Sequence, residues 1–291
     1  MPDPCTGHLT SCIVFAMKNT RLAFVGAGNM ARSLVGGLIA DGWDPARISV
    51  SDPDETQLSA LRSRFPVRTA TRNSELVETS DVVVLAVKPQ VIRNVARELA
   101  DTVQGHRPLV ISVVAGVRAA DLQRWLGGDC ALVRCMPNTP ALVQSGATAL
   151  FASHTVSADQ KDVAESILRA VGLALWIEDE SLMDAVTAVS GSGPAYFLLV
   201  IEALQDAGEA LGLDHKTARL LALQTAFGAA KMALESSEDV AILRQQVTSP
   251  GGTTEKALAV LEDGRIRELF NKALTAARDR SRELAARFGA A

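Results

Sequence analysis

A glycine-rich turn near the start of the chain has the residue types and spacing of a nucleotide-binding loop. Gly26-Ala-Gly-Asn-Met-Ala31 follows a short apolar run and opens a segment of helical spacing. The first glycine permits a tight turn, Gly28 lets backbone approach a pyrophosphate, and the small Ala31 lets helix and strand pack. A purely structural turn is the alternative. The residues expected to hold the dinucleotide at the helix N-terminus are Gly26, Ala27, Gly28, Asn29 and Met30.

A second segment, Val247-Thr-Ser-Pro-Gly-Gly-Thr-Thr254, has the types and order of a small-anion site. It predicts a bend into a helix start, where backbone N–H groups and hydroxyls converge and the helix dipole adds positive potential. A carboxylate is a suitable guest. Together with the first motif, the segment indicates hydride transfer to a small carboxylate. The candidate residues are Ser249, Gly251, Gly252, Thr253 and Thr254.

Asp52 ends the second apolar run and has two interpretations. A carboxylate at this place usually accepts hydrogen bonds from the adenosine ribose, which favours NAD over NADP. The residues that follow, Pro53, Asp54 and Glu55, include no cation for a 2′-phosphate. The alternative is that Asp52 only caps the helix that begins near Asp54.

Two further segments leave strand ends, where ligands of such sheets bind. Ala86-Val-Lys-Pro89 is expected to line the nicotinamide side, with Lys88 either facing the ligand or lying exposed at a helix start. In Arg134-Cys-Met-Pro-Asn-Thr-Pro140, the two prolines stiffen a loop around Asn138. Ser190-Gly-Ser-Gly-Pro-Ala-Tyr196 is either a helix-start signal or a backbone segment near substrate.

The elements that must position these residues fall into two patterns. Between residues 21 and 178, apolar runs alternate with helical spacing, which predicts a mostly parallel sheet with helices on both faces. The expected strands are Leu22–Gly26, Ile48–Ser51, Val82–Val87, Leu109–Ala115, Ala131–Cys135, Ala147–Phe151 and Leu173–Ile177. The expected helices between them are Met30–Ala40, Asp54–Phe65, Pro89–Leu99 and Ala158–Val171.

After Asp179 only helices are expected. They are Pro194–Leu211, Asp214–Ser236, Val240–Gln246, Thr254–Asp263 and Ile266–Phe288. This places a dinucleotide-binding domain at residues 17–180 and a helical domain at 181–291. The helical domain is rich in Ala and Leu, so we expect it to bury its apolar faces against a second copy of the chain.

Composition excludes several functions. The net charge of −4 and the absence of a Lys/Arg cluster argue against nucleic-acid binding. The apolar runs Val82–Val87 and Leu109–Ala115 are too short to span a bilayer. The four histidines are scattered and the cysteines form no C-x-x-C pair, so we expect no metal and reduced thiols in a cytoplasmic protein. Residues 1–16 join neither domain and are expected to be a disordered leader or to precede the natural start at Met17.

In this order, the motifs resemble those of pyrroline-5-carboxylate reductases, over about residues 21 to 288. The resemblance implies an N-terminal Rossmann-type doubly wound sheet followed by an all-α dimerisation domain. It implies NADP(H) or NAD(H) as cofactor, and homodimers that can assemble into decamers. It also implies that Ser249, Gly251, Gly252 and Thr253 hold the substrate carboxylate, while Thr254 places its hydroxyl against the ring nitrogen. Lys88, Pro89 and Asn138 would line the nicotinamide side.

The chain departs from the family in one segment. The usual H-P-x-x-L-K-D is here Asp239-Val-Ala-Ile-Leu-Arg-Gln245, so Gln245 replaces an aspartate and the His-Pro pair is absent. A catalytic role for that segment is therefore in doubt. The expected reaction, hydride transfer to a protonated cyclic imine, needs no histidine acid and no metal, and depends on proximity and orientation.

Two other functions compete with this one. A dehydrogenase of the 3-hydroxyacid type would need a catalytic lysine on the first long helix of the second domain, and Pro194–Leu211 contains none. A regulatory protein with an inactive site is the non-enzymatic alternative, and the intact Ser249–Thr254 segment argues against it.

Overall fold

The computed structural model describes residues 19–290, which form two compact units. Unit 1 contains the described residues up to Gly191 and those from Arg278 onward, and unit 2 is Ser192–Ala277. The two units are described separately. The expected domain boundary at residue 180 stays a prediction, and the expected leader, residues 1–16, lies outside the described residues.

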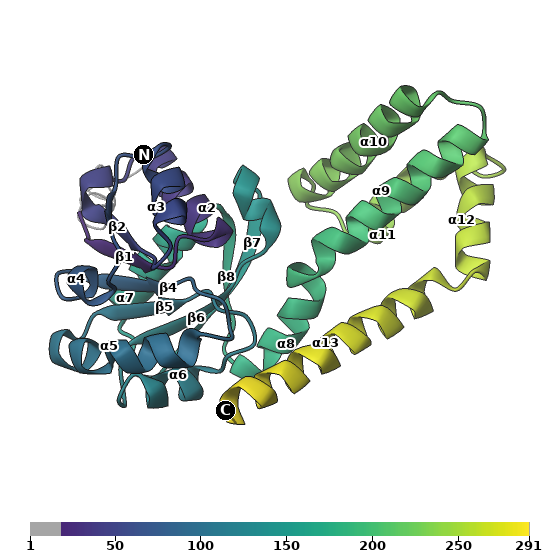
Figure 1. Cartoon of the computed structure of the whole chain (residues 1–291). Helices are drawn as coiled ribbons and strands as arrows, with labels where there is room; N and C mark the ends of the chain where they lie inside the picture. Colours follow the sequence, from purple (N-terminus) through teal and green to yellow (C-terminus); the bar gives the residue numbers. More distant parts are fainter. Residues whose placement is uncertain (1–18, 291) are drawn as a thin grey trace, which may run out of the picture. The chain divides into compact units, whose positions relative to one another are not determined.

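Unit 1 is built on one eight-stranded sheet (Figure 1). Its order is β3-β2-β1-β4-β5-β6-β7-β8, and only the β6–β7 pair is antiparallel. The mostly parallel sheet is therefore confirmed. The strands are β1 Leu22–Val25, β2 Ile48–Ser51, β3 Arg68–Ala70, β4 Val82–Leu85, β5 Leu109–Ser112, β6 Leu132–Met136, β7 Gly146–Ala152 and β8 Gly172–Trp176.

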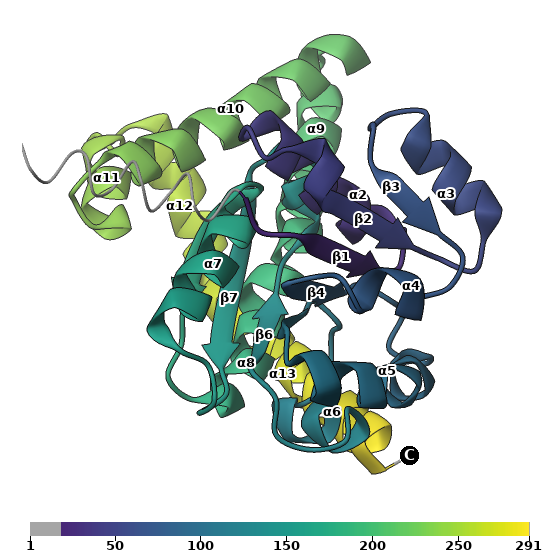
Figure 2. The same cartoon turned by 90° about the vertical axis from the view of Figure 1, so that its left-hand side faces the viewer.

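The central strands are apolar throughout because both faces of the sheet are covered by helices (Figure 2). In β4, Val82 and Val84 pack into one core with α2 and α7, whereas Val83 and Leu85 pack into another with α5 and α6. The helices of unit 1 are α2 Asn29–Ala40, α3 Glu55–Arg62, α4 Ser74–Val77, α5 Ile92–His106, α6 Ala119–Trp125, α7 Ala158–Arg169, α8 Met183–Val186 and the end of α13.

Some elements differ from the sequence-based expectation. The strand β3 was not expected, because it has only three residues, none of them buried, and no apolar run marks it. The segment from Glu180 to Gly191 is helical, with successive 3-10, α and π turns that no simple period predicts. The expected helix start at Pro89 is wrong: α5 begins at Ile92 and continues to His106.

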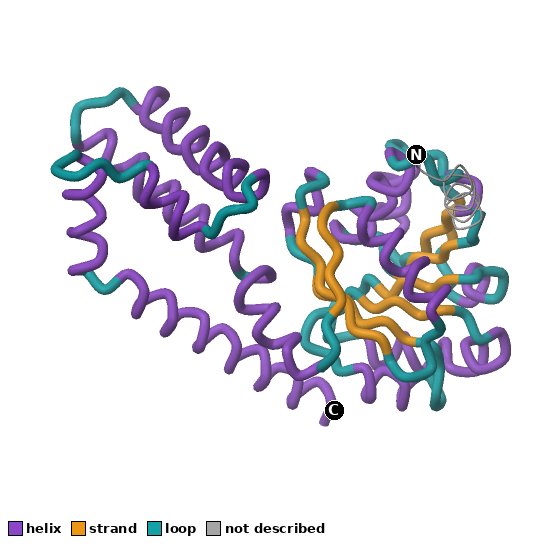
Figure 3. The backbone as a smooth tube through the Cα atoms, turned by 180° about the vertical axis from the view of Figure 1, so that it is seen from behind, coloured by secondary structure: helices purple, strands orange, loops and turns teal. Residues whose placement is uncertain are grey.

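Unit 2 contains only helices (Figure 3). They are α9 Gly193–Ala210, α10 His215–Glu235, α11 Val240–Gln246, α12 Thr253–Asp263 and the first part of α13 Ile266–Ala290. Helices α9 and α10 pack closely, and a Cβ at Gly208 would lie only 3.3 Å from the Cβ of Ala218. Few side chains of this unit are buried, which leaves large apolar groups such as Phe197, Leu199 and Leu234 more than 60% exposed.

One helical run has the length and apolarity of a membrane span. Glu180–Ala210 reaches a mean hydropathy of 1.3 over its most apolar window, of which 11% is buried. The apolar stretches Val82–Val87 and Leu109–Ala115 are too short to span a bilayer, but Glu180–Ala210 is a longer run in which apolar residues are interrupted by polar ones. Core and interface helices of non-membrane proteins meet the same criterion, so length and composition alone assign no membrane here.

Candidate functional site

The glycine-rich turn has the geometry that its sequence predicts. Gly26 follows β1 with φ of +106°, and its N–H donates to the carbonyl of Ser51 at 2.7 Å. A Cβ at this position would lie 2.7 Å from the carbonyl oxygen of Ala86, at the end of β4. Only glycine fits, because both the left-handed conformation and the close approach exclude a side chain.

The next glycine faces open space. Gly28 is the N-cap of α2, and a Cβ there would meet nothing within 4 Å. No acidic residue lies in the first turn of α2, and the buried Ala31 lets the helix pack on the sheet. The helix N-terminus thus presents free N–H groups and positive potential beside an open backbone, which suits the pyrophosphate of a dinucleotide.

Asp52 supports this turn directly. Its Oδ2 accepts the N–H of Ala27 at 2.8 Å, and its Oδ1 accepts the N–H of Asp54 at 2.9 Å. The interpretation of Asp52 as a helix cap is wrong, because Asp54 is the N-cap of α3 and accepts the N–H of Thr56. The hydrogen bond from the N–H of Thr56 lowers the pKa of the Asp54 carboxyl group. The role of Asp52 toward a ribose stays a prediction.

Sequence reasoning missed one cation beside this turn. Arg32 of α2 is partly buried, and its Nη2 donates to Oε1 of Gln57 in the first turn of α3. The Nε of Arg32 is buried without a partner, and within the described residues the side chain has no carboxylate partner. The expectation that no cation is near the end of β2 considered only residues 53–55. A signal was present, since no acid lies three or four residues after Arg32 along the helix.

The segment after β4 lies beside the glycine-rich turn. Ala86 and Val87 are partly buried against Gly26, while Lys88 is exposed and makes no ion pair among the described residues. Lys88 does not lie at a helix start, because α5 begins at Ile92, and the carbonyl of Lys88 instead accepts the N–H of Val91. The interpretation of Lys88 as a residue at a helix start is therefore wrong.

Asn138 connects two of the predicted motifs. Its side chain is almost fully buried, with Oδ1 accepting the N–H of Ala147 at 2.9 Å and Nδ2 donating to the carbonyl of Ser190 at 3.0 Å. The amide thus ties the loop after β6 to the π-helical turn that precedes α9. This places Asn138 in the framework of the loop, with both ends of the amide already bonded.

The predicted carboxylate segment belongs to unit 2. It links α11 to α12, with Gly251 at φ of +73° and the N–H of Gly252 bonded to the carbonyl of Ser249. Helix α12 begins at Thr253, one residue earlier than expected, and its N-cap is Gly252. Thr254 is therefore the second residue of the helix and not its cap.

The donors of this segment are largely free. Within the described residues, the hydroxyls of Ser249, Thr253 and Thr254 make no hydrogen bond, and neither do the backbone N–H groups of the two threonines. Besides the N–H of Gly252, the N–H of Gly251 is in use, because it donates to Oε2 of Glu255 at 2.7 Å. The backbone of the segment thus already donates to a carboxylate, which is the kind of ligand that the segment is predicted to bind.

The described residues offer no metal site and no activated thiol. No group of three or more His, Cys, Asp or Glu side chains converges among them. Cys130 and Cys135 are free and buried, and burial raises the pKa of the Cys130 thiol to about 11 and the pKa of Cys135 still further.

The sheet order, the glycine-rich turn and the open N-terminus of α2 define a Rossmann-type dinucleotide-binding protein with a helical second unit. The family model described as pyrroline-5-carboxylate reductase dimerisation matches residues 180–284, and that of NADP oxidoreductase, coenzyme F420-dependent, matches residues 21–116. The chain belongs to the pyrroline-5-carboxylate reductase family.

Relatives cover nearly the whole chain. The pyrroline-5-carboxylate reductase of Pseudomonas aeruginosa is 50% identical over 273 residues, which are 94% of this chain and 100% of the relative. The enzyme structure from Coxiella burnetii has 52% identity and a TM-score of 0.89, covering 91% of this chain and 98% of that one. The Plasmodium falciparum structure, with NADP bound, has 30% identity and a TM-score of 0.81 over 92% and 99% of the chains.

Proposed function

We propose that this protein reduces 1-pyrroline-5-carboxylate to L-proline with NAD(P)H, the last step of proline biosynthesis. The observation that carries the proposal is family membership along nearly the whole chain, with the free donors of the Ser249–Thr254 segment intact. A nicotinamide supplies the hydride, and the chain's residues bind and orient the reactants.

In this proposal the residues of the two units have separate tasks. The turn from Gly26 to Met30 and the N-terminus of α2 hold the pyrophosphate, and Asp52 keeps the turn in shape. Residues 86–89 line the nicotinamide side, and Asn138 supports it through the loop after β6. The carboxylate of the substrate is held by Ser249, Gly251, Gly252 and Thr253. It would bind where the N–H of Gly251 donates to the carboxylate of Glu255 in this structure.

Thr254 is the proposed positioning group for the ring nitrogen. Its hydroxyl makes no hydrogen bond within the described residues and its side chain is only partly exposed, so it is available to a ligand. The imine takes its proton from water before hydride arrives, which explains why no histidine acid is needed. Gln245 lies exposed at the end of α11 and has no part in the proposed chemistry.

The assembly is part of the proposal. The match to the dimerisation model supports oligomerisation, and we propose a homodimer formed through unit 2, with decamers as the larger assembly. The buried, reduced thiols of Cys130 and Cys135 suit a cytoplasmic location. Neither nucleic acid nor a membrane is a proposed partner, given the net charge of −4 and the absence of a basic cluster.

A turnover assay tests the proposed activity. Purified protein is incubated with 1-pyrroline-5-carboxylate and either NADPH or NADH, and proline formation is measured together with nicotinamide oxidation. Stoichiometric proline is expected. Oxidation of NAD(P)H only when a 3-oxoacid is supplied, with the 3-hydroxyacid as product, would favour the rival dehydrogenase. Nucleotide binding without turnover of either substrate would favour a regulatory protein.

A further inference from the structure

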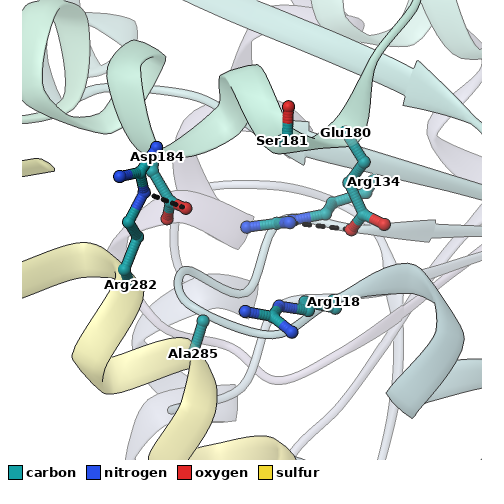
Figure 4. A pocket seen from close by; sticks show the side chains of 7 residues that line it. All are labelled: Arg118, Arg134, Glu180, Ser181, Asp184, Arg282 and Ala285. Atoms are coloured by element: carbon teal, nitrogen blue, oxygen red, sulfur yellow. Dashed lines mark hydrogen bonds and ion pairs between the residues drawn. The ribbon is translucent and has the colours of Figure 1, made fainter. Parts of the chain in front are cut away.

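A cavity of about 340 Å³ lies within unit 1, away from the glycine-rich turn. It is bounded by β6, the start of α6, the helical segment after Glu180 and the end of α13 (Figure 4). Its walls carry an unusual concentration of charge. The lining residues are Arg118, Arg134, Glu180, Ser181, Asp184, Arg282 and Ala285.

The central group is Arg134, whose side chain is only 5% exposed. Its Nη1 donates to Oε1 of Glu180 at 2.7 Å, and the same oxygen also accepts the N–H of Ala119 at 2.7 Å. The Nε and Nη2 of Arg134 make no hydrogen bond within the described residues, yet they are not among its fully buried unpaired atoms. These donors therefore have accessible surface, and Arg134 is one of the residues that line the cavity. A buried guanidinium with free donors favours an additional acceptor, because unmet hydrogen bonds of a buried cation are costly.

The charges around the cavity do not balance. Three guanidinium groups face two carboxylates, and Arg118 has no ion-pair partner among the described residues. Arg282 has two long ion pairs, with Nε at 3.8 Å from Oδ2 of Asp184 and Nη1 at 3.9 Å from Oδ1 of Asp279. Oδ1 of Asp184 already accepts the hydroxyl of Ser281 at 2.7 Å. Glu180 pairs with Arg134, and Asp184 and Asp279 share Arg282, which leaves Arg118 as the lining cation without an ion pair among the described residues.

We propose that this cavity binds a small monocarboxylate. A carboxylate matches the planar fork of a guanidinium and can accept from Arg134 and Arg118 together. One negative charge matches the unpaired Arg118, whereas a dianionic phosphate would leave excess negative charge beside Glu180 and Asp184. Ala285 supplies an apolar wall for a short carbon chain. The volume lies within the range of small-molecule sites.

The site is independent of the proposed catalytic residues. None of the residues from 249 to 254 lines it, and it contains none of the nicotinamide-side residues. A bound carboxylate would join β6, α6 and α13, and so stabilise unit 1.

The test uses the full-length protein and sodium acetate, whose methyl group is observed by saturation-transfer difference NMR at constant ionic strength. Wild type is expected to show a saturable signal. Arg118→Gln should raise the acetate Kd at least tenfold without changing the melting temperature, because Arg118 is exposed and unpaired. Arg124→Gln is the control: it removes an exposed arginine at the other end of α6 that pairs with Asp121 and donates to the carbonyl of Gly289, but does not line the cavity, and its Kd should stay within twofold.

Three results would overturn the proposal. The first is no saturable signal in wild type, which would mean that the cavity holds only water. The second is an unchanged Kd in Arg118→Gln, and the third is tighter binding of inorganic phosphate, measured by its displacement of acetate. Thr253→Ala separates this site from the proposed catalytic segment, because the Arg118-dependent signal should persist in that variant. A signal lost in Thr253→Ala but kept in Arg118→Gln would assign acetate to the segment instead.

Discussion

Individual side chains divide into those that shape the nucleotide site and those that face ligand. Asp52 belongs to the first group, because both of its oxygens accept backbone N–H groups of neighbouring turns. We expect Arg32 to belong to the second, since among the described residues it has no carboxylate partner and it lies near the end of β2, where Rossmann-type folds bind the adenosine ribose. A cation there accommodates a 2′-phosphate, so we expect NADPH to be the better cofactor.

Arg32→Gln should therefore act on NADPH alone. Loss of one charge-assisted contact costs about 1.5–3 kcal/mol, or roughly ten- to a hundredfold in affinity. The Kd for 2′,5′-ADP should rise by this factor, while that for 5′-AMP should hardly change. Asp52→Asn is the contrast, because loosening the turn should weaken both nucleotides alike. An Arg32→Gln variant with an unchanged ratio of the two Kd values would exclude a 2′-phosphate contact.

Thr254→Ala should lower kcat sharply while leaving nucleotide affinity nearly unchanged. The lost hydrogen bond to the ring nitrogen is worth about 1.5–3 kcal/mol, which is roughly ten- to a hundredfold in rate. Thr254→Ser keeps the hydroxyl and should recover much of the rate. Because Gly252 is the cap of α12, alanine should change the melting temperature little. A normal kcat in the alanine variant would end the positioning role.

The thiols of Cys130 and Cys135 should resist alkylation in the native protein. Burial raises the pKa of Cys130 to about 11 and that of Cys135 still higher, so almost no thiolate forms at pH 8. Iodoacetamide labelling followed by peptide mapping should find both residues unmodified in native protein and modified in urea. Rapid native labelling of either residue would show that its strand opens readily.

At the scale of elements, a glycine decides how closely two helices of unit 1 approach each other. Gly37 of α2 lies against the end of α7, where an added Cβ would lie 2.5 Å from the carbonyl oxygen of Ala170. Gly105 of α5 has open space around it. Both are helical, so the same substitution separates packing from helix propensity.

Gly37→Ala should therefore destabilise the protein, whereas Gly105→Ala should not. Overpacking costs about 1–3 kcal/mol, while alanine in an open helical position contributes up to about 1 kcal/mol. Urea unfolding at constant protein concentration measures both. Equal midpoints for the two variants would show that α2 moves away from α7 without cost.

At the scale of the whole molecule, unit 2 carries an apolar surface that no other part of the described chain covers. Four of its large apolar side chains are each more than 60% exposed: Phe197, Leu199, Phe227 and Leu234. Isolated monomers rarely expose so many large apolar side chains. Together with the match to a dimerisation model, this surface is the expected interface with a second copy.

Sedimentation at micromolar concentration should accordingly show no monomer. Phe227→Glu puts a charge into the expected interface and should shift the equilibrium toward monomer. A stable, active wild-type monomer would contradict the proposed interface.

The sequence by itself determined the motifs and most of the elements, although not the short helices α4 and α6, because the signals that it carries are local. Apolar runs fix the buried strands, glycine spacing fixes the turn after β1, and Ala/Leu periodicity fixes the helices of unit 2. The short edge strand β3 and the irregular turns before α9 carry no such period, so they were not expected.

Only the tertiary structure decided which side chains meet. It assigned the cap of α3 to Asp54 and gave Asp52 to the glycine-rich turn, a contact between residues 25 positions apart. It brought Arg32 to Gln57, Asn138 to Ser190, and Arg134 to Glu180 around a cavity. These partners come from different elements, and no local pattern predicts their distance, because it is set by how sheet and helices pack.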